Sequence, residues 1–356
     1  MLKMENSLSV CIITKDNEKT IGNVISSVIS IAGEIVVVDT GSKDKTKDIA
    51  NSLGCKVYGF SWNNNFSDAK NFAVSKATGN WILALDADET ISELDARKIK
   101  QTIEKKNQFL GYYLIQRNYS NSMGDFGWVS SRDDSYSESK VAKGYSPRKM
   151  ARIFRNHPEI KFEGAVHDTV VPSIERIGPG LIGETDIVIH HYGYLNRQEE
   201  RAEKYIEIEK QNIRNDYFQE YQIASQLHSI GKLNEALEHL ANSIKLNQNF
   251  HASLLLLGII SIKKCKIIEA KPVLLRALEL KQDEMAWEHL GIVETYEKNF
   301  DKAIACFNKA IEINPKNADF YYNLGNTLKL AGKLNQAKQA YAKAVYLNPD
   351  YSERIE

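Results

Sequence analysis

Two aspartates at the end of an apolar segment are the sharpest candidates for chemistry in the sequence. Asp86 and Asp88 follow residues 81–85, which are apolar throughout and predict a buried strand. Alternate residues beyond a strand end can address one point, where a divalent cation would bridge them to phosphate oxygens. An Asp-x-Asp pair also occurs by chance in surface turns. Here no Lys or Arg lies within three residues of the pair to neutralise it, which favours the metal-binding interpretation.

Asp39 and Lys70 are further candidates for binding a ligand. Asp39 directly follows a β-branched run, where a carboxylate can accept hydrogen bonds from a ribose or from a base edge. It could equally cap the helix that follows, and Gly41 permits a tight turn into that helix. Lys70 lies near the start of another predicted helix, where it could meet a diphosphate or remain solvated.

These polar residues need a scaffold that brings them to one place. Over residues 8–90, strand-like runs at 8–14, 34–39, 55–60 and 81–85 alternate with helical patterns at 21–31, 45–53 and 67–77. The alternation predicts a parallel sheet that is buried on both faces, an α/β architecture typical of nucleotide binding. Ligands of such sheets lie beyond the carboxyl ends of the strands, which is where the candidates fall.

The periodicity disappears between Arg117 and Pro147, in a serine-rich stretch that also contains Trp128. A disordered insertion and a lid over a ligand are both compatible with this composition. Strand-like segments resume at 150–154 and 187–191. A long polar helix is then predicted over 197–215.

A repeat with a period of 33 or 34 residues occupies the rest of the chain, as its alanines show: Ala236, Ala270, Ala303 and Ala337. Small residues at this spacing let paired helices approach closely. The pattern resembles four tetratricopeptide repeats over residues 217–349. Such stacks bind peptides or proteins on a concave face, although these could also only buttress the first domain or form a dimer.

Four segments, residues 12–18 and the stretches around Asp39, Lys70 and Asp86, resemble motifs of the family 2 glycosyltransferases of GT-A fold. The resemblance covers residues 8–195. The resemblance implies that the nucleoside diphosphate of a sugar donor is held by five residues: Thr14, Glu18, Asp39, Lys70 and Asp86. It also implies that Asp86 and Asp88 bind Mn²⁺ or Mg²⁺. The cation would neutralise the diphosphate leaving group.

Residues 152–168 and 190–194 are similar to motifs of bacterial family members that carry tetratricopeptide tails. Asp168 stands where those members have Glu, and the resemblance makes it the base that removes the acceptor proton, with His167 as the competing candidate. His191 would complete the metal shell, with His190 on the opposite face of its strand. Some of these relatives glycosylate polypeptides, including bacteriocin S-glycosyltransferases, and others resemble lipopolysaccharide-core glucosyltransferases.

Composition restricts the partners and the compartment. The chain has 46 basic and 46 acidic side chains, which disfavours a nucleic-acid-binding surface or a polybasic membrane arm. No apolar run approaches the roughly 18–20 residues of a transmembrane helix. Four scattered cysteines without metal-site spacing favour a reducing cytoplasm.

The sequence thus predicts a GT-A domain over residues 1–196, a helical linker over 197–216 and a four-repeat solenoid over 217–356. The predicted activity is metal-dependent, inverting transfer of a hexose from a UDP-sugar to a Ser/Thr hydroxyl or Cys thiol of a peptide or protein that the repeats dock. The alternatives are extension of a lipid-linked or cell-surface glycan, and an inactive transferase that acts as a scaffold. The solenoid end, with Tyr341, Tyr346 and Tyr351, is either a capped terminus or a face between two copies.

Overall fold

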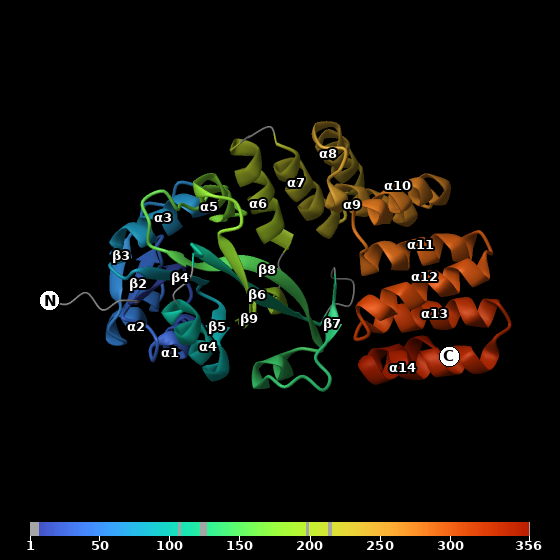
Figure 1. Cartoon of the computed structure of the whole chain (residues 1–356), viewed down its shortest axis with the longest axis horizontal. Coiled ribbons are helices and arrows are strands. Elements are labelled where there is room, and N and C mark those ends of the chain that lie inside the picture. The colour runs from blue at the N-terminus through green and yellow to red at the C-terminus, as the bar shows by residue number, and fades with distance from the viewer. Residues whose placement is uncertain (1–6, 106–107, 122–126, 197–198, 213–215, 356) are drawn as a thin grey trace. The chain divides into compact units, whose positions relative to one another are not determined.

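The computed structural model describes residues 7–105, 108–121, 127–196, 199–212 and 216–355. The chain forms two compact units (Figure 1). The first comprises Met1–Tyr119, Tyr136–Glu138 and Pro147–Asn196, and the second comprises Ser120–Ser135, Ser139–Ser146 and Arg197–Glu356. None of the helices in the described part of the chain has the length and apolar character that a membrane span requires.

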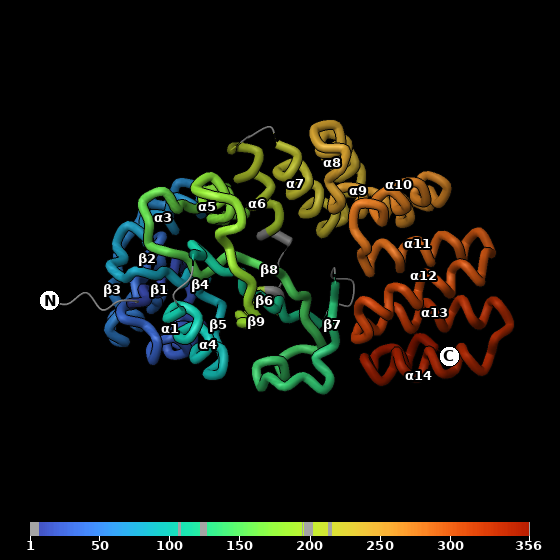
Figure 2. Tube along the Cα trace, in the orientation of Figure 1, coloured from blue at the N-terminus to red at the C-terminus, as the bar shows by residue number. Residues whose placement is uncertain are grey.

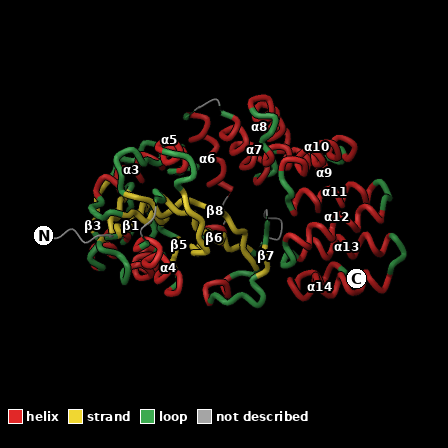
Figure 3. The backbone as a smooth tube through the Cα atoms, in the orientation of Figure 1, coloured by secondary structure: helices red, strands yellow, loops and turns green. Residues whose placement is uncertain are grey.

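The first unit is built on a mixed sheet (Figure 3). Its strands are β1 (Leu8–Thr14), β2 (Glu34–Asp39), β3 (Lys56–Gly59), β4 (Trp81–Asp86), β5 (Glu89–Ile91), β6 (Gly111–Ser120), β8 (Gly144–Arg155) and β9 (Ile182–His191). They lie in the order β3-β2-β1-β4-β8-β6-β9-β5. Strand β7 (Val129–Ser130) pairs with Gly144 and Tyr145 at the start of β8, and these residues belong to the second unit, as β7 does. Strands β1 to β4 are mutually parallel, as the sequence predicted, whereas β8 runs antiparallel to β4.

Helices cover both faces of this sheet. They are α1 (Ile21–Val28), α2 (Thr46–Ser52), α3 (Phe66–Lys76), α4 (Glu93–Glu104) and α5 (Val171–Ile177). In Figure 1, α3 and α5 lie on one side of the strands and α1, α2 and α4 on the other. Alternate residues of β1 enter the two cores, Val10 and Ile12 with α1 and α4, and Cys11 and Ile13 with α3 and α5. This burial on both faces explains why the parallel strands are continuous apolar runs.

The parallel register brings three predicted site residues to one edge. Thr14 pairs with Asp39 across β1 and β2, and Ile13 pairs with Asp86 across β1 and β4. The carboxyl ends of these strands therefore meet at the same edge of the sheet, where ligands of open α/β sheets bind.

The second unit contains α6 (Glu199–Gln211) and four antiparallel helix pairs, which Figure 2 traces in order. The pairs are α7 (Tyr217–Ser229) with α8 (Leu233–Leu246), α9 (His251–Lys263) with α10 (Ile267–Leu280), α11 (Glu284–Tyr296) with α12 (Phe300–Ile313), and α13 (Ala318–Leu330) with α14 (Leu334–Leu347). The close approach predicted from the small residues is present. A Cβ on Gly291 would lie 2.9 Å from the Phe307 ring of the partner helix.

Part of the serine-rich stretch belongs to this second unit. We call residues 127–135 and 139–146 the inserted segment; it contains β7 and most of the 3-10 helix η1 (Ser137–Val141). Trp128 is fully buried in a cluster with Ala318, Ala344, Leu347 and Tyr351. Ser130 donates its backbone N–H to the Lys316 carbonyl at 3.0 Å and its hydroxyl to the Leu347 carbonyl at 2.6 Å.

The inserted segment also contacts the solenoid end whose state the sequence left open. The Tyr346 hydroxyl donates to Asp133 at 2.6 Å, and Tyr351, in the 3-10 helix η3 (Pro349–Arg354), is buried. The chain's own residues therefore cover part of this end. Of the serine-rich stretch, residues 122–126 lie outside the described residues.

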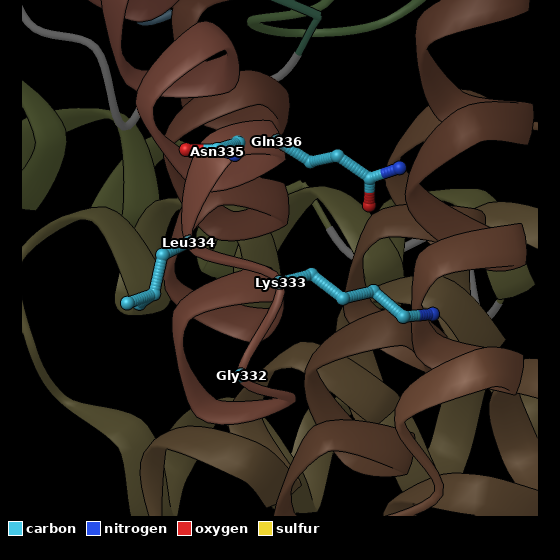
Figure 4. A pocket seen from close by; sticks show the side chains of 5 residues that line it. All are labelled: Gly332, Lys333, Leu334, Asn335 and Gln336. Carbon is cyan, nitrogen blue, oxygen red and sulfur yellow. The ribbon is translucent and has the colours of Figure 1, made fainter.

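An open hollow lies at the turn between α13 and α14, lined by residues 332–336 (Figure 4). The Lys333 and Gln336 side chains extend to the same side of it, and Lys333 pairs with Asp301 at 3.0 Å. No carboxylate lines this hollow. The residues with catalytic potential lie instead at the carboxyl edge of the sheet in the first unit.

Candidate functional site

Lys70 lies between two carboxylates that are far apart in the sequence. Its Nζ is 2.9 Å from Asp86 Oδ1 and 2.8 Å from Asp168 Oδ2. Lys70 comes from α3, Asp86 from the end of β4, and Asp168 from the loop before α5. The side chain of Asp86 is 33% exposed, whereas those of Asp168 and Lys70 are only 9% and 7% exposed. Asp86 is therefore the member of this group that faces an incoming ligand.

Arg152, on β8, provides Asp86 with a second counter-ion. Its Nη2 is 2.8 Å from Asp86 Oδ2 and 3.4 Å from Glu89 Oε1. Glu89 is fully buried and also accepts hydrogen bonds from the Asp86 backbone N–H, at 2.8 Å, and from the Gln116 side chain. Nε and Nη1 of Arg152 are buried without hydrogen-bond partners among the described residues.

Opposite charges alternate along this network, and they shift the pKa of its members. Burial alone would raise the pKa of Asp86, but the charges of Arg152 and Lys70 hold it well below the usual value. Burial dominates at Glu89 and raises its pKa. Burial and the charge of Arg152 act to lower the pKa of Lys70, but Asp168 and Asp86 outweigh them and raise it. Asp86 and Lys70 are therefore both charged near neutral pH.

Asp88 and His191 form a second group at the same edge. His191 Nε2 lies 3.5 Å from Asp88 Oδ1, and its Nδ1 is 2.7 Å from Asn118 Oδ1. The register explains the placement, because β9 carries His191 between Glu89 of β5 and Asn118 of β6. A Cβ on Gly193 would overlap both Asp88 and His191, so a larger residue there would displace these side chains.

These two side chains suit a divalent cation in part. A carboxylate oxygen beside a histidine nitrogen matches the donor types of metal sites, and a hydrogen bond from the other ring nitrogen to an amide is the contact that orients such a histidine. In the described part of the chain, no three His, Cys, Asp or Glu side chains are grouped to hold a metal. Asp86 is engaged by Lys70 and Arg152. Of the predicted metal set, Asp86, Asp88 and His191, the last two therefore lie together, whereas Asp86 is paired with the two cations. A metal ion would need further oxygens from a nucleotide and water.

The loop that carries Asp168 is fixed to α3. Asn71 donates its side-chain amide to the Phe162 carbonyl at 3.0 Å and accepts from the Phe162 N–H at 2.8 Å. The Ser67 hydroxyl donates to the Gly164 carbonyl at 2.6 Å, and the Phe66 N–H donates to the Ala165 carbonyl at 2.7 Å. Lys70 and Asp168 are therefore positioned by one helix.

The predicted nucleoside contacts lie in two interlocked loops after β1 and β2. Asp39 is buried, and its carboxylate accepts from the backbone N–H groups of Gly41 and Ser42. It therefore stabilises the loop rather than the first turn of α2. Thr14 donates its hydroxyl to Asn17 at 3.0 Å, and Glu18 accepts from the Lys45 N–H at 3.2 Å.

The other two histidines of the predicted motifs, His190 and His167, differ in their surroundings. His190 lies on the opposite face of β9 from His191, with Nδ1 2.7 Å from the Tyr119 hydroxyl and its ring stacked on Tyr119. His167 is half-buried next to Asp168 in the loop. Five further residues of this edge were not predicted from the sequence to have a role: Glu89, Gln116, Asn118, Arg152 and Gly193.

Comparison with known families agrees with this architecture. Residues 9–160 match the family described as glycosyl transferase family 2. Residues 291–332 match a TPR repeat model and residues 318–351 a tetratricopeptide repeat model. The chain therefore contains a family 2 glycosyltransferase domain followed by tetratricopeptide repeats, as the sequence predicted.

Curated relatives show similarity over parts of the chain. A TPR repeat-containing protein of Synechococcus elongatus is 28% identical over 193 residues, covering 52% of this chain and 42% of that protein. An uncharacterized glycosyltransferase of Rickettsia bellii is 38% identical over 113 residues, covering 31% and 38%. Glycosyltransferase SunS of Bacillus phage SPbeta is 26% identical over 252 residues, covering 67% and 54%. The chain spans about half or less of the length of these relatives.

Solved structures with similarity cover the repeats. MamA from Desulfovibrio magneticus RS-1 is 20% identical with a TM-score of 0.38, covering 43% of this chain and 92% of that chain. YrrB, described as a TPR protein with an unusual peptide-binding site, is 22% identical with a TM-score of 0.37, covering 42% and 80%. The assignment of the repeats rests on the family models and the helix pairs.

Proposed function

We propose that this protein is a metal-dependent, inverting glycosyltransferase that moves a hexose from a UDP-sugar to a peptide or protein side chain. The observation that carries the proposal is the convergence of Lys70, Asp86, Arg152 and Asp168 at the carboxyl edge of a family 2 glycosyltransferase domain. An inactive scaffold would have no need to keep four buried or half-buried charges together, because such networks are costly to desolvate.

The donor would bind across this edge. Thr14, Glu18 and Asp39 lie in the two loops that would hold the nucleoside, and Lys70 and Asp86 would lie where the diphosphate meets the sugar. Asp88 and His191 would hold Mn²⁺ or Mg²⁺, which supplies charge neutralisation for the departing diphosphate. Asn118 would keep the His191 ring in the orientation that presents Nε2.

The chemistry assigned to the chain's own residues is removal of one proton. The acceptor oxygen or sulfur bonds to the anomeric carbon from the face opposite the diphosphate. The bond from that carbon to the diphosphate oxygen breaks, and its electron pair leaves with UDP. The acceptor proton passes to the Asp168 carboxylate. His167, the neighbouring residue, is the alternative proton acceptor.

UDP release from a panel of UDP-sugars tests the donor half of the proposal. We expect turnover of one donor in the presence of Mn²⁺ or Mg²⁺, its loss in EDTA, and a fall of at least about 100-fold in Asp88→Ala, since a metal ligand is removed. Asp68→Asn, which removes an exposed carboxylate of α3, is the matched control and should retain turnover. Equal turnover in EDTA would contradict metal dependence.

A labelled donor then tests the acceptor half. Transfer to Ser, Thr or Cys side chains in a peptide library would support the peptide proposal, whose basis is the tetratricopeptide unit carried by the same chain. Transfer only to free or lipid-linked saccharides would refute it while leaving the glycosyltransferase activity in place.

A further inference from the structure

We infer that Lys70 is a positioning residue that passes from Asp168 to the donor diphosphate, so that donor binding releases Asp168 to accept the acceptor proton. This inference rests on the proposed function. The geometry behind it is the pair of contacts at Lys70 Nζ, 2.9 Å to Asp86 and 2.8 Å to Asp168. An ammonium group beside a carboxylate stabilises its charged form, so such a carboxylate takes up a proton less readily than one whose ion pair has opened.

The two carboxylates would be affected differently when Lys70 moves. Asp86 keeps Arg152 as a counter-ion, 2.8 Å away. Asp168 has no other cation paired with it among the residues that the structure describes. Its side chain is 9% exposed, so water compensates little of its charge. Arg152 still attracts Asp168, but the two form no ion pair. Moving Lys70 therefore leaves Asp168 as the less compensated of the two carboxylates, and uptake of the acceptor proton removes that cost.

The donor supplies a reason for Lys70 to move. Two cations, Lys70 and Arg152, face Asp86, Asp168 and Glu89, so the network holds no excess positive charge for a diphosphate. An ammonium group has three N–H donors, and phosphate oxygens are strong acceptors for them. The diphosphate must therefore compete with a carboxylate for Lys70.

The surrounding contacts allow this exchange without a rearranged loop. The hydrogen bonds of Phe66, Ser67 and Asn71 hold the loop of Asp168 on α3 independently of Lys70. Asp168 therefore remains in place when its ion pair opens. The consequence is that Asp168 takes up the acceptor proton more readily once the donor is bound than before.

Equilibrium binding of UDP, measured by calorimetry with Mn²⁺ present, tests the exchange without knowledge of the acceptor. In Asp168→Asn the competing carboxylate is gone, so UDP should bind roughly three- to tenfold more tightly than to the wild type, the scale of one ion pair. Lys70→Met should weaken binding by a similar factor or more. Lys70→Arg, which keeps the charge, should restore part of the affinity.

The double variant separates this exchange from simple repulsion. If Asp168 acts through Lys70, then Asp168→Asn has no effect on UDP affinity in the Lys70→Met background. Tightening that persists in that background, or no tightening with Lys70 present, overturns the inference. Asp68→Asn removes a charge from the same helix where the side chain contacts Asn63, and should leave affinity unchanged.

The two proposals fail in distinguishable ways. If the wild type binds neither UDP nor another nucleoside diphosphate, the proposed function fails, and the inference with it. If UDP binds and supports turnover but Asp168→Asn does not tighten it, only the inference fails. Thermal unfolding of each full-length variant identifies any that do not fold, and Lys70→Arg then provides the second test.

Discussion

Glu288 and Glu294 lie on α11 and are equally buried at 5% exposed, yet their surroundings shift their pKa values in opposite directions. Burial, reinforced by the charge of Asp319, raises the pKa of Glu288 to about 8. Burial opposes ionisation of Glu294 too, but hydrogen bonds from Lys271 and Asn299 outweigh it and lower the pKa. The same helix therefore carries one carboxyl group whose protonated form is favoured and one whose ionised form is favoured.

A pH-dependent gain in stability should follow from Glu288→Gln. The pKa of Glu288 is about 8 when folded and 4.5 when unfolded, so the folded state binds the proton more tightly. Its contribution to the unfolding free energy is present below pH 4.5 and is lost as pH rises to about 8. Glutamine stays neutral and can still accept from Asn323. The variant should match the wild type near pH 4.5 and exceed it by about 1–3 kcal/mol at pH 8.

Chemical unfolding at several pH values, with hydrogen exchange of α11 as the local probe, measures this gain. Glu294→Gln is the matched control and should destabilise at pH 8, because Lys271 loses one of its two carboxylate partners in the described chain, 2.8 Å away, and keeps only Glu297. Parallel pH profiles of Glu288→Gln and the wild type would contradict the assignment.

At the carboxyl edge of the sheet, the residues at the ends of strands could be predicted from the sequence. Thr14, Asp39 and Asp86 are of this kind, because parallel strands place their carboxyl ends together whatever the rest of the topology is. Arg152 could not be placed, because its contact with Asp86 depends on β8 pairing with β4 in antiparallel fashion, which no local pattern specifies. The available signal was that Arg152 is the one charged residue of the otherwise apolar run 150–154.

Elements with a clear period were predicted well, and the others were not. The first four strands and the repeat helices follow from apolar runs and from the 33- or 34-residue spacing. Helix α4 was missed although its signal is present: Ala96, Ile99 and Ile103 are buried on one face and Ser92 caps its N-terminus. Burial alternates along most of β6, but the buried positions include the polar residues Gln116 and Asn118. Its sequence therefore lacks the alternation of apolar and polar residues that would predict a half-buried strand.

The turn inside each helix pair shows a left-handed residue at a fixed position. Gly231, Cys265, Lys298 and Gly332 have φ of 77°, 57°, 61° and 75°. Side chains with a Cβ adopt this conformation at a cost of about 1–2 kcal/mol, from which the greater chain entropy of unfolded glycine must be subtracted.

Cys265→Gly should therefore raise the unfolding free energy of the second unit by about 0.5–1 kcal/mol. Urea unfolding of the full chain under reducing conditions measures the effect. The reverse change at the equivalent position, Gly332→Ala, should lower it by a similar amount. A loss of stability in Cys265→Gly would mean that the thiol contributes more than the strain costs.

At the scale of the whole molecule, neither unit is one continuous stretch of the sequence. The inserted segment lies between strands of the first unit in the chain, yet its residues pack with the last helix pair. The unit to which this segment belongs could not be predicted from the sequence, because a contact between residues 217 positions apart leaves no periodic pattern. Trp128 in a polar stretch was the available indication.

Trp128→Ala should therefore destabilise the second unit, although the residue lies within the sequence span of the first. Removing a fully buried tryptophan costs about 3–5 kcal/mol. Hydrogen exchange should show faster exchange in α13 and α14 of the full-length variant. Phe154→Ala, in the core of the first unit, is the matched control and should leave α13 and α14 protected. Unchanged exchange in these helices for Trp128→Ala would contradict the packing.

The docking of Ser130 on Leu347 has a consequence for biosynthesis. The two residues are 217 positions apart, so at roughly 5–20 residues per second the inserted segment leaves the ribosome about 10–40 s before its docking site is synthesised. During that interval the Trp128 indole has no partner helices and is available to chaperones. A chain that ends before residue 318 would lack these partners, so its Trp128 would stay exposed.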